Sequence, residues 1–202
     1  MIILNLQILV DSLLSDVRKF IPNFANMQVG DVVLDLCCGT GEQVLEFGRN
    51  GITATGIDIN SNILKIALKN KAKSKLENVS FQQADATNLP FQDCHFDCVS
   101  ISFGLHDKRK TAREKIVSEM TRVVKNNGTL IFVDFQFPLP ANISGLVVRG
   151  IEFLAGRGHY HNFKDYLKNG GINTLLNAKT PKQVDRVLLK NRIATAIRIV
   201  KS

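Results

Sequence analysis

Short apolar runs alternate with amphipathic segments along most of this chain, and this alternation predicts its secondary structure. The apolar runs are typical of buried strands and cover Val32–Leu36, Thr53–Ile57, Val79–Gln83, Asp97–Ser102 and Thr129–Phe135. Helical periodicity lies between them, over Gly41–Asn50, Asn62–Lys73 and Arg113–Val124. Strands separated by helices form a parallel sheet with right-handed crossovers. The pattern predicts an α/β fold, a three-layer, doubly wound and mostly parallel sheet.

The two ends of the chain depart from this alternation. An amphipathic N-terminal helix is expected near Leu4–Phe20, closed by Pro22. Beyond Phe135 we expect an apolar helix over Ser144–Leu154, a glycine-framed stretch around Gly158-His-Tyr-His161, a helix from Thr180-Pro181 to about Leu189, and a final strand over Ile193–Val200. We interpret residues 1–202 as a single domain with a core at 28–135 and a helical substrate-side insert at about 136–179.

Composition is typical of one globular domain. The chain has 202 residues, of which 45% are hydrophobic and 22% charged. No apolar run reaches the roughly 18 residues of a membrane-spanning helix. The first residues, Met1-Ile-Ile-Leu, lack the basic segment and cleavage site of a signal peptide. We therefore expect a cytoplasmic protein.

The net charge of +8 is concentrated in the last third of the chain. Residues 141–202 hold 11 basic and 3 acidic side chains, whereas the charges of residues 1–140 cancel. A basic region can bind nucleic acid, an anionic membrane surface or an acidic substrate. It can also be an ordinary solvated face.

The cysteines at 37, 38, 94 and 98 are expected to be free thiols, because nothing indicates secretion. Cys94, His95 and Cys98 could supply part of a zinc site, but no second pair of ligands lies nearby in the sequence. We therefore expect no metal.

A glycine loop follows the first predicted strand. Gly39 and Gly41 allow a sharp turn and a close approach to a ligand. The N-terminus of the next helix offers N–H groups and partial positive charge to a carboxylate. Asp35, near the end of the strand, could receive an ammonium group directly or through water. Together these features favour an amino-acid moiety over a bare diphosphate.

Two more carboxylates follow the next two strands. Asp58 could accept both hydroxyls of a ribose, and Asp85 could accept the amino group of an adenine. Each alone is typical of a turn or cap, but three at successive strand ends indicate a ligand site, because sheet ligands bind at those ends. A nicotinamide cofactor is the alternative. Its fingerprint needs a third glycine, where this chain has Val44.

These motifs resemble a known family. Val33-Leu-Asp-Leu-Cys-Cys-Gly-Thr-Gly41, Gly56-Ile-Asp-Ile-Asn60, Asp85-Ala-Thr-Asn-Leu-Pro-Phe91 and Phe96-Asp-Cys-Val-Ser-Ile-Ser-Phe-Gly-Leu105 look like those of class I S-adenosylmethionine-dependent methyltransferases. Within that class they are most similar to the ubiquinone/menaquinone biosynthesis C-methyltransferase group. The resemblance covers about Gly30 to Pro138 and implies S-adenosyl-L-methionine as cofactor.

The resemblance also implies which residues bind that cofactor: Asp35, Gly39, Thr40 and Gly41 at the methionine end, Asp58 and Ile59 at the ribose, Asp85 and Ala86 at the adenine, and Ser102 near the methionine half. Cys37 stands where the wider superfamily has a third glycine. We interpret it as a small buried hydrophobe rather than a catalytic group.

The substrate side departs from the family pattern. The quinone group carries an arginine and an asparagine where this chain has His106 and Asp107, and its tyrosine-containing segment has no match here. The fold usually ends in a strand hairpin, whereas we expect one final strand.

The sulfonium methyl of the cofactor is already activated, so the protein mainly positions the reactants and excludes water. A carbon nucleophile beside a phenolic hydroxyl would also need a base, and His106 is the first candidate. The alternative is an exposed loop histidine or a helix cap. Residues His159, Tyr160 and His161 could form a lid or a packed turn.

Three functions remain open. The first is a methyltransferase for a small, lipophilic or aromatic, quinone-like acceptor, with Leu146–Leu154 and the basic region resting on an anionic membrane. The second is a macromolecular (RNA or protein) methyltransferase. Nucleic acid is disfavoured, because Ser102-Phe-Gly-Leu replaces the Asp/Asn-Pro-Pro-aromatic segment of enzymes that methylate base amino groups. The third is a non-catalytic S-adenosylmethionine-binding protein.

Overall fold

The computed structural model describes residues 14–176 and 183–201. Within these residues, its centre is one mixed sheet of seven strands. Across the sheet, the strands in this part of the chain are β3 (Val79–Gln83), β2 (Thr53–Asp58), β1 (Val32–Leu36), β4 (Phe96–Ser102), β5 (Val124–Phe135), β7 (Ala194–Val200) and β6 (Gln183–Leu189). The first five run parallel, and β7 is antiparallel to both of its neighbours. The predicted doubly wound α/β sheet is confirmed.

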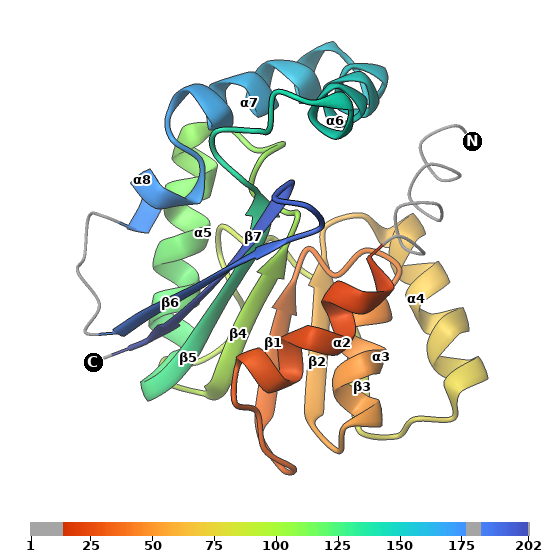
Figure 1. Ribbon diagram of the computed structural model, residues 1–202. Helices are drawn as coiled ribbons and strands as arrows, with labels where there is room; N and C mark the ends of the chain where they lie inside the picture. The colour runs from red at the N-terminus through yellow and green to blue at the C-terminus, as the bar shows by residue number, and fades with distance from the viewer. Residues whose placement is uncertain (1–13, 177–182, 202) are drawn as a thin grey trace.

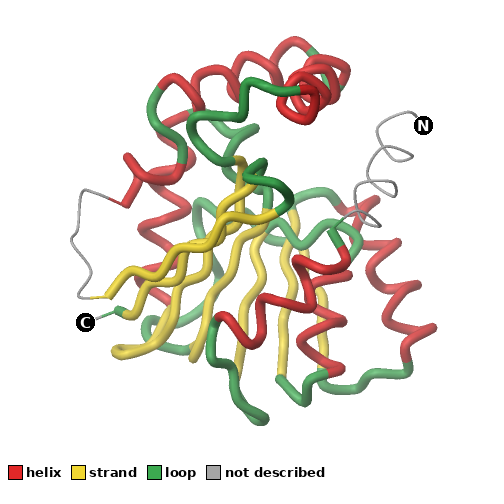
Figure 2. The backbone as a smooth tube through the Cα atoms, viewed as in Figure 1, coloured by secondary structure: helices red, strands yellow, loops and turns green. Residues whose placement is uncertain are grey.

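Helices flank the sheet on both faces (Figures 1 and 2). Their bounds are α2 (Ser15–Phe24), α3 (Glu42–Arg49), α4 (Ser61–Ser74), α5 (Lys110–Val123), α6 (Ile143–Leu154), α7 (Arg157–Lys168) and α8 (Ile172–Leu176). In Figure 1, α6 and α7 lie beyond the carboxyl ends of the parallel strands and form a cover over that edge. None of the helices in the described segments is long and apolar enough to cross a membrane.

Successive residues of the central strands are buried in two hydrophobic cores, one on each face of the sheet. Val33 and Ile131 pack with side chains of α2 and α3. Leu34 and Phe132, the next residues along, pack on the other face with α5 residues such as Met120. Because both faces are covered, these strands have no polar side and appear in the sequence as uninterrupted apolar runs.

Two helix starts explain the sharp turns after β1 and β2. Asn60 caps α4, and its Oδ1 accepts a hydrogen bond of 3.0 Å from the Asn62 backbone N–H. Gly41 begins α3 at φ +83°, and a Cβ there would collide with the Phe81 ring. The glycine is therefore required both by backbone conformation and by space.

The N-terminal helix does not end at Pro22, as we expected. The described part, α2, continues to Phe24 with Pro22 inside it, and residues 4–13 of the expected helix lie outside the described residues. Proline has no N–H for the carbonyl four residues earlier. That carbonyl belongs to Arg18, and it accepts a hydrogen bond of 3.3 Å from Gln43 Nε2. A tertiary contact therefore takes the place of the missing helical bond.

The expected helix from Thr180-Pro181 to Leu189 is wrong where the structure describes it. Residues from Gln183 to Leu189 form the edge strand β6, which pairs with β7 along its whole length. The expectation of a single final strand is wrong for the same reason, because β6 and β7 form a hairpin. Pairing between strands outweighs the local helix-start signal, part of which lies in the undescribed residues 180–182.

Two further boundaries differ from expectation. Gly158-His-Tyr-His161 belongs to the helix α7 rather than to a turn. Strand β5 already begins at Val124 rather than at the expected Thr129, although Asn127 within it has φ +61°. The apolar helix expected over Ser144–Leu154 is confirmed as α6.

Candidate active site

A cavity of about 130 Å³ lies at the carboxyl end of β1, between the glycine loop and α2. Four residues predicted to bind the cofactor line it: Asp35, Gly39, Thr40 and Ser102. Arg18 of α2 also reaches its wall. The edge of the sheet where ligands of such folds bind therefore contains a hollow with groups of both charges.

Asp35 is buried at this cavity, next to β4. Its Oδ1 accepts a hydrogen bond of 2.6 Å from Ser100 Oγ on that strand. Burial raises the pKa of Asp35 to about 7, against the opposing effects of the Ser100 hydrogen bond and the Arg18 charge. A cationic group in the cavity would favour the ionised form, so the site suits an ammonium group.

The glycine loop is fixed by one backbone hydrogen bond to β2 and one within the loop. Cys38 N donates to Ile57 O at 2.9 Å, and Gly41 N donates to Cys38 O at 2.9 Å. Cys37, at φ +54°, lines the cavity. Burial raises the pKa of the Cys37 thiol to about 12, so it remains protonated at neutral pH, in keeping with our interpretation of a small hydrophobe. All four cysteines are free.

Asp58 ends β2 and clamps the glycine loop. Its Oδ2 accepts from Gly39 N at 3.1 Å, and its Oδ1 accepts from Asn60 N at 2.9 Å. Each carboxylate oxygen has a further lone pair, so both can still accept a hydroxyl. The side chain of Ile59 is exposed directly beyond it.

Asp85 and Ala86 follow β3, on the far side of β2. Asp85 Oδ1 accepts from both the backbone N–H and the hydroxyl of Thr87, each at 2.8 Å, while Ala86 is buried. The strand order β3-β2-β1 places the three carboxylates along one edge of the sheet. Asp58 and Asp85 do not line the cavity. They are related to Asp35 because their strands are neighbours in the sheet, and the three residues do not share one enclosed pocket.

Ser102 ends β4 on the opposite side of β1. Its Oγ is buried and has no hydrogen-bond partner among the described residues. Because an unsatisfied buried hydroxyl is costly, this group suits a polar atom of a ligand in the cavity that it lines.

His106 is 5% exposed, so the alternative of an exposed loop histidine is wrong. Its Nδ1 lies 2.8 Å from Asp134 Oδ1, and its Nε2 lies 3.5 Å from Glu152 Oε2 on α6. Burial lowers its pKa, but the carboxylates of Asp134, Glu152 and Asp107 outweigh burial and raise it overall. The Phe135 ring also packs against the imidazole, with ring centroids 4.8 Å apart.

Sequence reasoning missed several charged residues around this site. Asp134 is fully buried in β5, and a carboxylate inside an apolar strand could have signalled it. Arg113 is buried as well and donates to Leu105 O, Asp165 Oδ2 and Asn162 O. Nothing local in the sequence placed Glu152 beside His106, because that contact depends on how α6 folds back.

Comparison with known proteins agrees with this geometry. Residues 33–128 match the family model described as a methyltransferase domain. The "Ubiquinone/menaquinone biosynthesis C-methyltransferase UbiE" of Pseudomonas aeruginosa is 39% identical over 126 residues, which cover 60% of this chain and 48% of that protein. The chain spans about half the length of the curated relatives that it matches.

Solved structures share the fold at low sequence identity. The MccD protein has a TM-score of 0.69 and 16% identity, covering 93% of this chain and 97% of that one. Phosphoethanolamine N-methyltransferase 2 of Haemonchus contortus, solved with S-adenosyl-L-methionine, has a TM-score of 0.64 and 16% identity, covering 90% and 51%.

Sheet order, glycine loop and family match together define a class I S-adenosylmethionine-dependent methyltransferase domain, and this chain carries one. S-Adenosyl-L-methionine is the methyl donor of that class. In sequence, the domain is a distant homologue of the UbiE C-methyltransferases.

Proposed function

We propose that this protein transfers a methyl group from S-adenosyl-L-methionine to a small, lipophilic or aromatic, quinone-like acceptor. The observation that carries the proposal is the buried Asp35 carboxylate beside a cavity that Arg18 and Ser102 also line. Such a cavity suits the zwitterionic end of the donor, and the likeness to UbiE supports the acceptor class.

The donor would extend from this cavity along the sheet edge. Asp35 would hold the ammonium group, directly or through water, and the N–H groups near Thr40 and Gly41 would face the carboxylate together with Arg18. The ribose would lie at Asp58 and Ile59, and the adenine at Asp85 and Ala86. Ser102 would meet the methionine half. When bound, the donor supplies an activated methyl group; the chain contributes orientation and exclusion of water.

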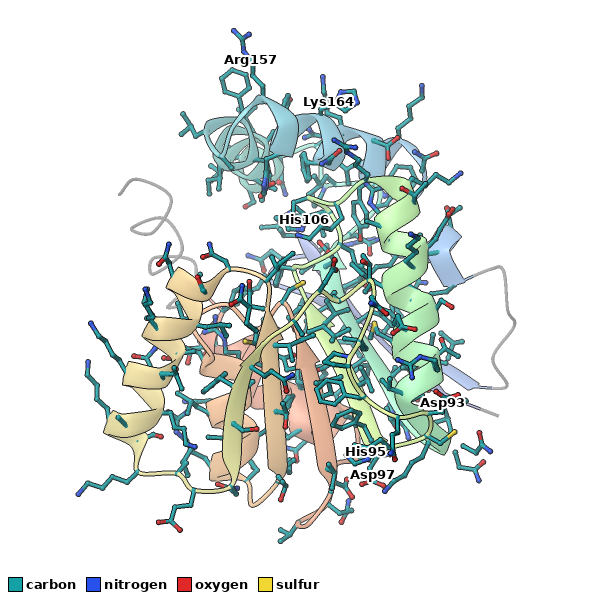
Figure 3. All side chains as sticks on the ribbon, turned by 180° about the vertical axis from the view of Figure 1, so that it is seen from behind. Asp93, His95, Asp97, His106, Arg157 and Lys164 are labelled. Atoms are coloured by element: carbon teal, nitrogen blue, oxygen red, sulfur yellow. The ribbon has the colours of Figure 1, made fainter. Side chains whose placement is uncertain are left out.

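The acceptor would bind under the cover. We infer that residues 136–179 are the substrate-side insert of a single domain whose core is 28–135. His106 lies where the β4–α5 loop meets that cover (Figure 3). Its Nδ1 lies 2.8 Å from Asp134 Oδ1. If Nε2 is free, it can take a proton from the acceptor. Base catalysis by His106 stays a prediction, and a ligand that occupied Nε2 would exclude it.

The outer side of α6 supports a lipophilic acceptor and contact with a membrane. Apolar side chains exposed on this helix are Ile143, Leu146, Val147, Phe153 and Leu154. Arg157 and Lys164 point outward from the same cover (Figure 3). Apolar groups beside cations are what an anionic membrane surface attracts. We infer that this cover rests on such a surface.

Calorimetric titration tests the donor site. Wild type should bind S-adenosylmethionine and S-adenosylhomocysteine at one molecule per chain. Asp58→Ala should weaken both by roughly tenfold or more, because a hydrogen bond to a charged group is worth about 1.5–3 kcal/mol. Asp93→Ala is the matched control, since Asp93 lies at the opposite edge of the sheet (Figure 3). Absence of binding by wild type would overturn the proposal.

The acceptor class is tested separately. With a short-chain quinol and labelled donor, wild type should form a methylated product, and RNA or a protein extract should receive no label. Label in RNA or protein, with none in the quinol, would instead support a macromolecular substrate. Donor binding without transfer to any of the three would support a non-catalytic binding protein.

A further inference from the structure

Three potential metal ligands converge where the cover meets the sheet. His106 comes from the β4–α5 loop, Glu152 from α6 and His159 from α7, and one ligand atom of each lies within 4.8 Å of the other two. We propose that these residues form a binding site for a divalent transition-metal ion of the zinc class.

Two of the three separations between ligand atoms are close to what such an ion needs. Glu152 Oε2 lies 3.5 Å from His106 Nε2 and 2.5 Å from His159 Nε2. Tetrahedral zinc with bonds of about 2.0–2.1 Å needs its ligand atoms about 3.3 Å apart. The two separations bracket that value, so small side-chain adjustments would complete the site. Imidazole and carboxylate are also ligands that zinc accepts, as in sites with two histidines and one glutamate.

A supporting carboxylate already orients one ligand. Asp134 accepts hydrogen bonds from the backbone N–H groups of Leu105, His106 and Phe135, so both of its oxygens act as acceptors. Its contact with His106 Nδ1 at 2.8 Å therefore places a proton on Nδ1. The Nε2 lone pair is then directed toward Glu152. Carboxylates commonly hold metal-bound histidines in this way.

The two buried carboxylates near the cluster also favour binding of a cation. Asp134 and Glu152 are 0% and 6% exposed, and aromatic rings of Phe135, Phe163 and Tyr166 surround His106. Buried carboxylates are costly without compensation. Two charged groups on neighbouring elements are already in ion pairs, Lys108 with Asp107 and Arg113 with Asp165. A divalent ion would balance the two carboxylates while both histidines stay neutral.

The competing explanation for this arrangement is a protonated histidine that lies between the carboxylates and shares its protons with them. A metal site and a protonated histidine differ in metal content. They also differ for catalysis, since a metal on His106 Nε2 would exclude the proton-accepting role proposed above. Three protein ligands leave a fourth position for an oxygen ligand, which would allow the ion to contact an acceptor as well as to fasten α6 and α7 to the core.

The test is metal titration of chelator-treated full-length protein. Zn²⁺ should bind at one ion per chain, and Co²⁺ should give visible absorption of a tetrahedral site. His159→Ala and Glu152→Gln should each weaken binding more than about 100-fold, and Asp134→Asn by about 10–100-fold. His161→Ala is the matched control, because this exposed histidine lies on the same helix outside the cluster. It should bind as wild type does.

Either of two results would overturn the proposal: no stoichiometric Zn²⁺ or Co²⁺ binding by wild type, or unchanged affinity in both ligand variants. If a variant fails to fold, X-ray absorption at the zinc edge of the wild type decides, and fewer than two imidazole ligands would overturn it. These readouts need no methyl transfer. Failure of donor binding would therefore refute the proposed function without touching the metal site.

Discussion

At the scale of one residue, Asp35 shows how burial changes the titration of a candidate binding group. Its surroundings remove water and leave the carboxyl with a pKa of about 7, so near neutrality the cavity holds a mixture of charged and neutral forms. A ligand with an ammonium group selects the charged form, which links donor affinity to proton release.

The affinity for S-adenosylhomocysteine should therefore rise about tenfold between pH 6 and pH 8, as the ionised fraction of Asp35 increases. Calorimetry in buffers of different ionisation enthalpy measures both the affinity and the released protons. Asp35→Asn should bind weakly and show a much smaller pH dependence. An equal slope in both proteins would assign the titration to another group.

The same carboxyl should destabilise the ligand-free protein at high pH. Its folded-state pKa is raised from 3.8 to about 7, so the favourable contribution is complete below the unfolded value and is lost as pH rises through 7. Urea unfolding should show Asp35→Asn gaining stability relative to wild type from pH 5 to pH 8. A constant difference across that range would contradict the raised pKa.

Several residues of the candidate site could be predicted from sequence, because each lies at the end of a recognisable strand. Asp35 and Asp58 needed only strand ends and a glycine loop, whereas Ser102 was implied by the family resemblance. The surroundings of His106 could not be predicted, since Glu152 and His159 arrive from helices whose packing no local pattern specifies.

At the scale of elements, one buried arginine connects the cover to the rest of the domain. Arg113 of α5 donates to Asp165 and to Asn162 O on α7, and its guanidinium lies 5.3 Å from the centroid of the Tyr166 ring. It also donates to Leu105 O, next to His106. One side chain thus connects α5, α7 and the loop that carries the candidate base.

Arg113→Ala should lower the free energy of unfolding by about 3 kcal/mol, at the lower end for a broken buried pair because Asp165 is partly exposed. Chemical denaturation followed by circular dichroism measures the loss. Lys115→Ala, an exposed change on the same helix, should be nearly neutral. A loss below about 1 kcal/mol for Arg113→Ala would show that α7 docks by other contacts.

Elements could be predicted where local pattern and tertiary role agree. The parallel strands are short apolar runs buried on both faces, so β1 and β3 were predicted at their observed bounds. Strand β6 is different. Its strand conformation comes from hydrogen bonds with β7, and its residues alternate between more and less exposed positions beside a misleading Thr180-Pro181 signal.

At the scale of the whole molecule, the cover exposes apolar side chains beside cations. Helix α6 exposes Leu146, Phe153 and Leu154, and Arg157 and Lys164 point outward from the cover (Figure 3), whereas most basic residues of the last third of the sequence lie after α7. Either feature alone would be unremarkable on a soluble surface. Together they favour a flat, anionic and partly apolar partner.

The protein should therefore sediment with vesicles containing anionic lipid and much less with neutral vesicles, and added salt should weaken the interaction. Leu146→Ser combined with Phe153→Ser should reduce the bound fraction. Val184→Ser, which changes an exposed apolar residue on the edge strand β6, is the control. Equal binding to neutral and anionic vesicles would contradict a role for charge.

The proposed donor contacts and the proposed acceptor side lie in different parts of the sequence. Donor contacts lie between Arg18 and Ser102, whereas His106, Glu152 and His159 come later. A recombination or grafting event after β5 could thus replace residues 137–176 and leave the donor cavity intact. In evolutionary terms, diverging copies of such a gene could alter their acceptor while keeping the same methyl donor.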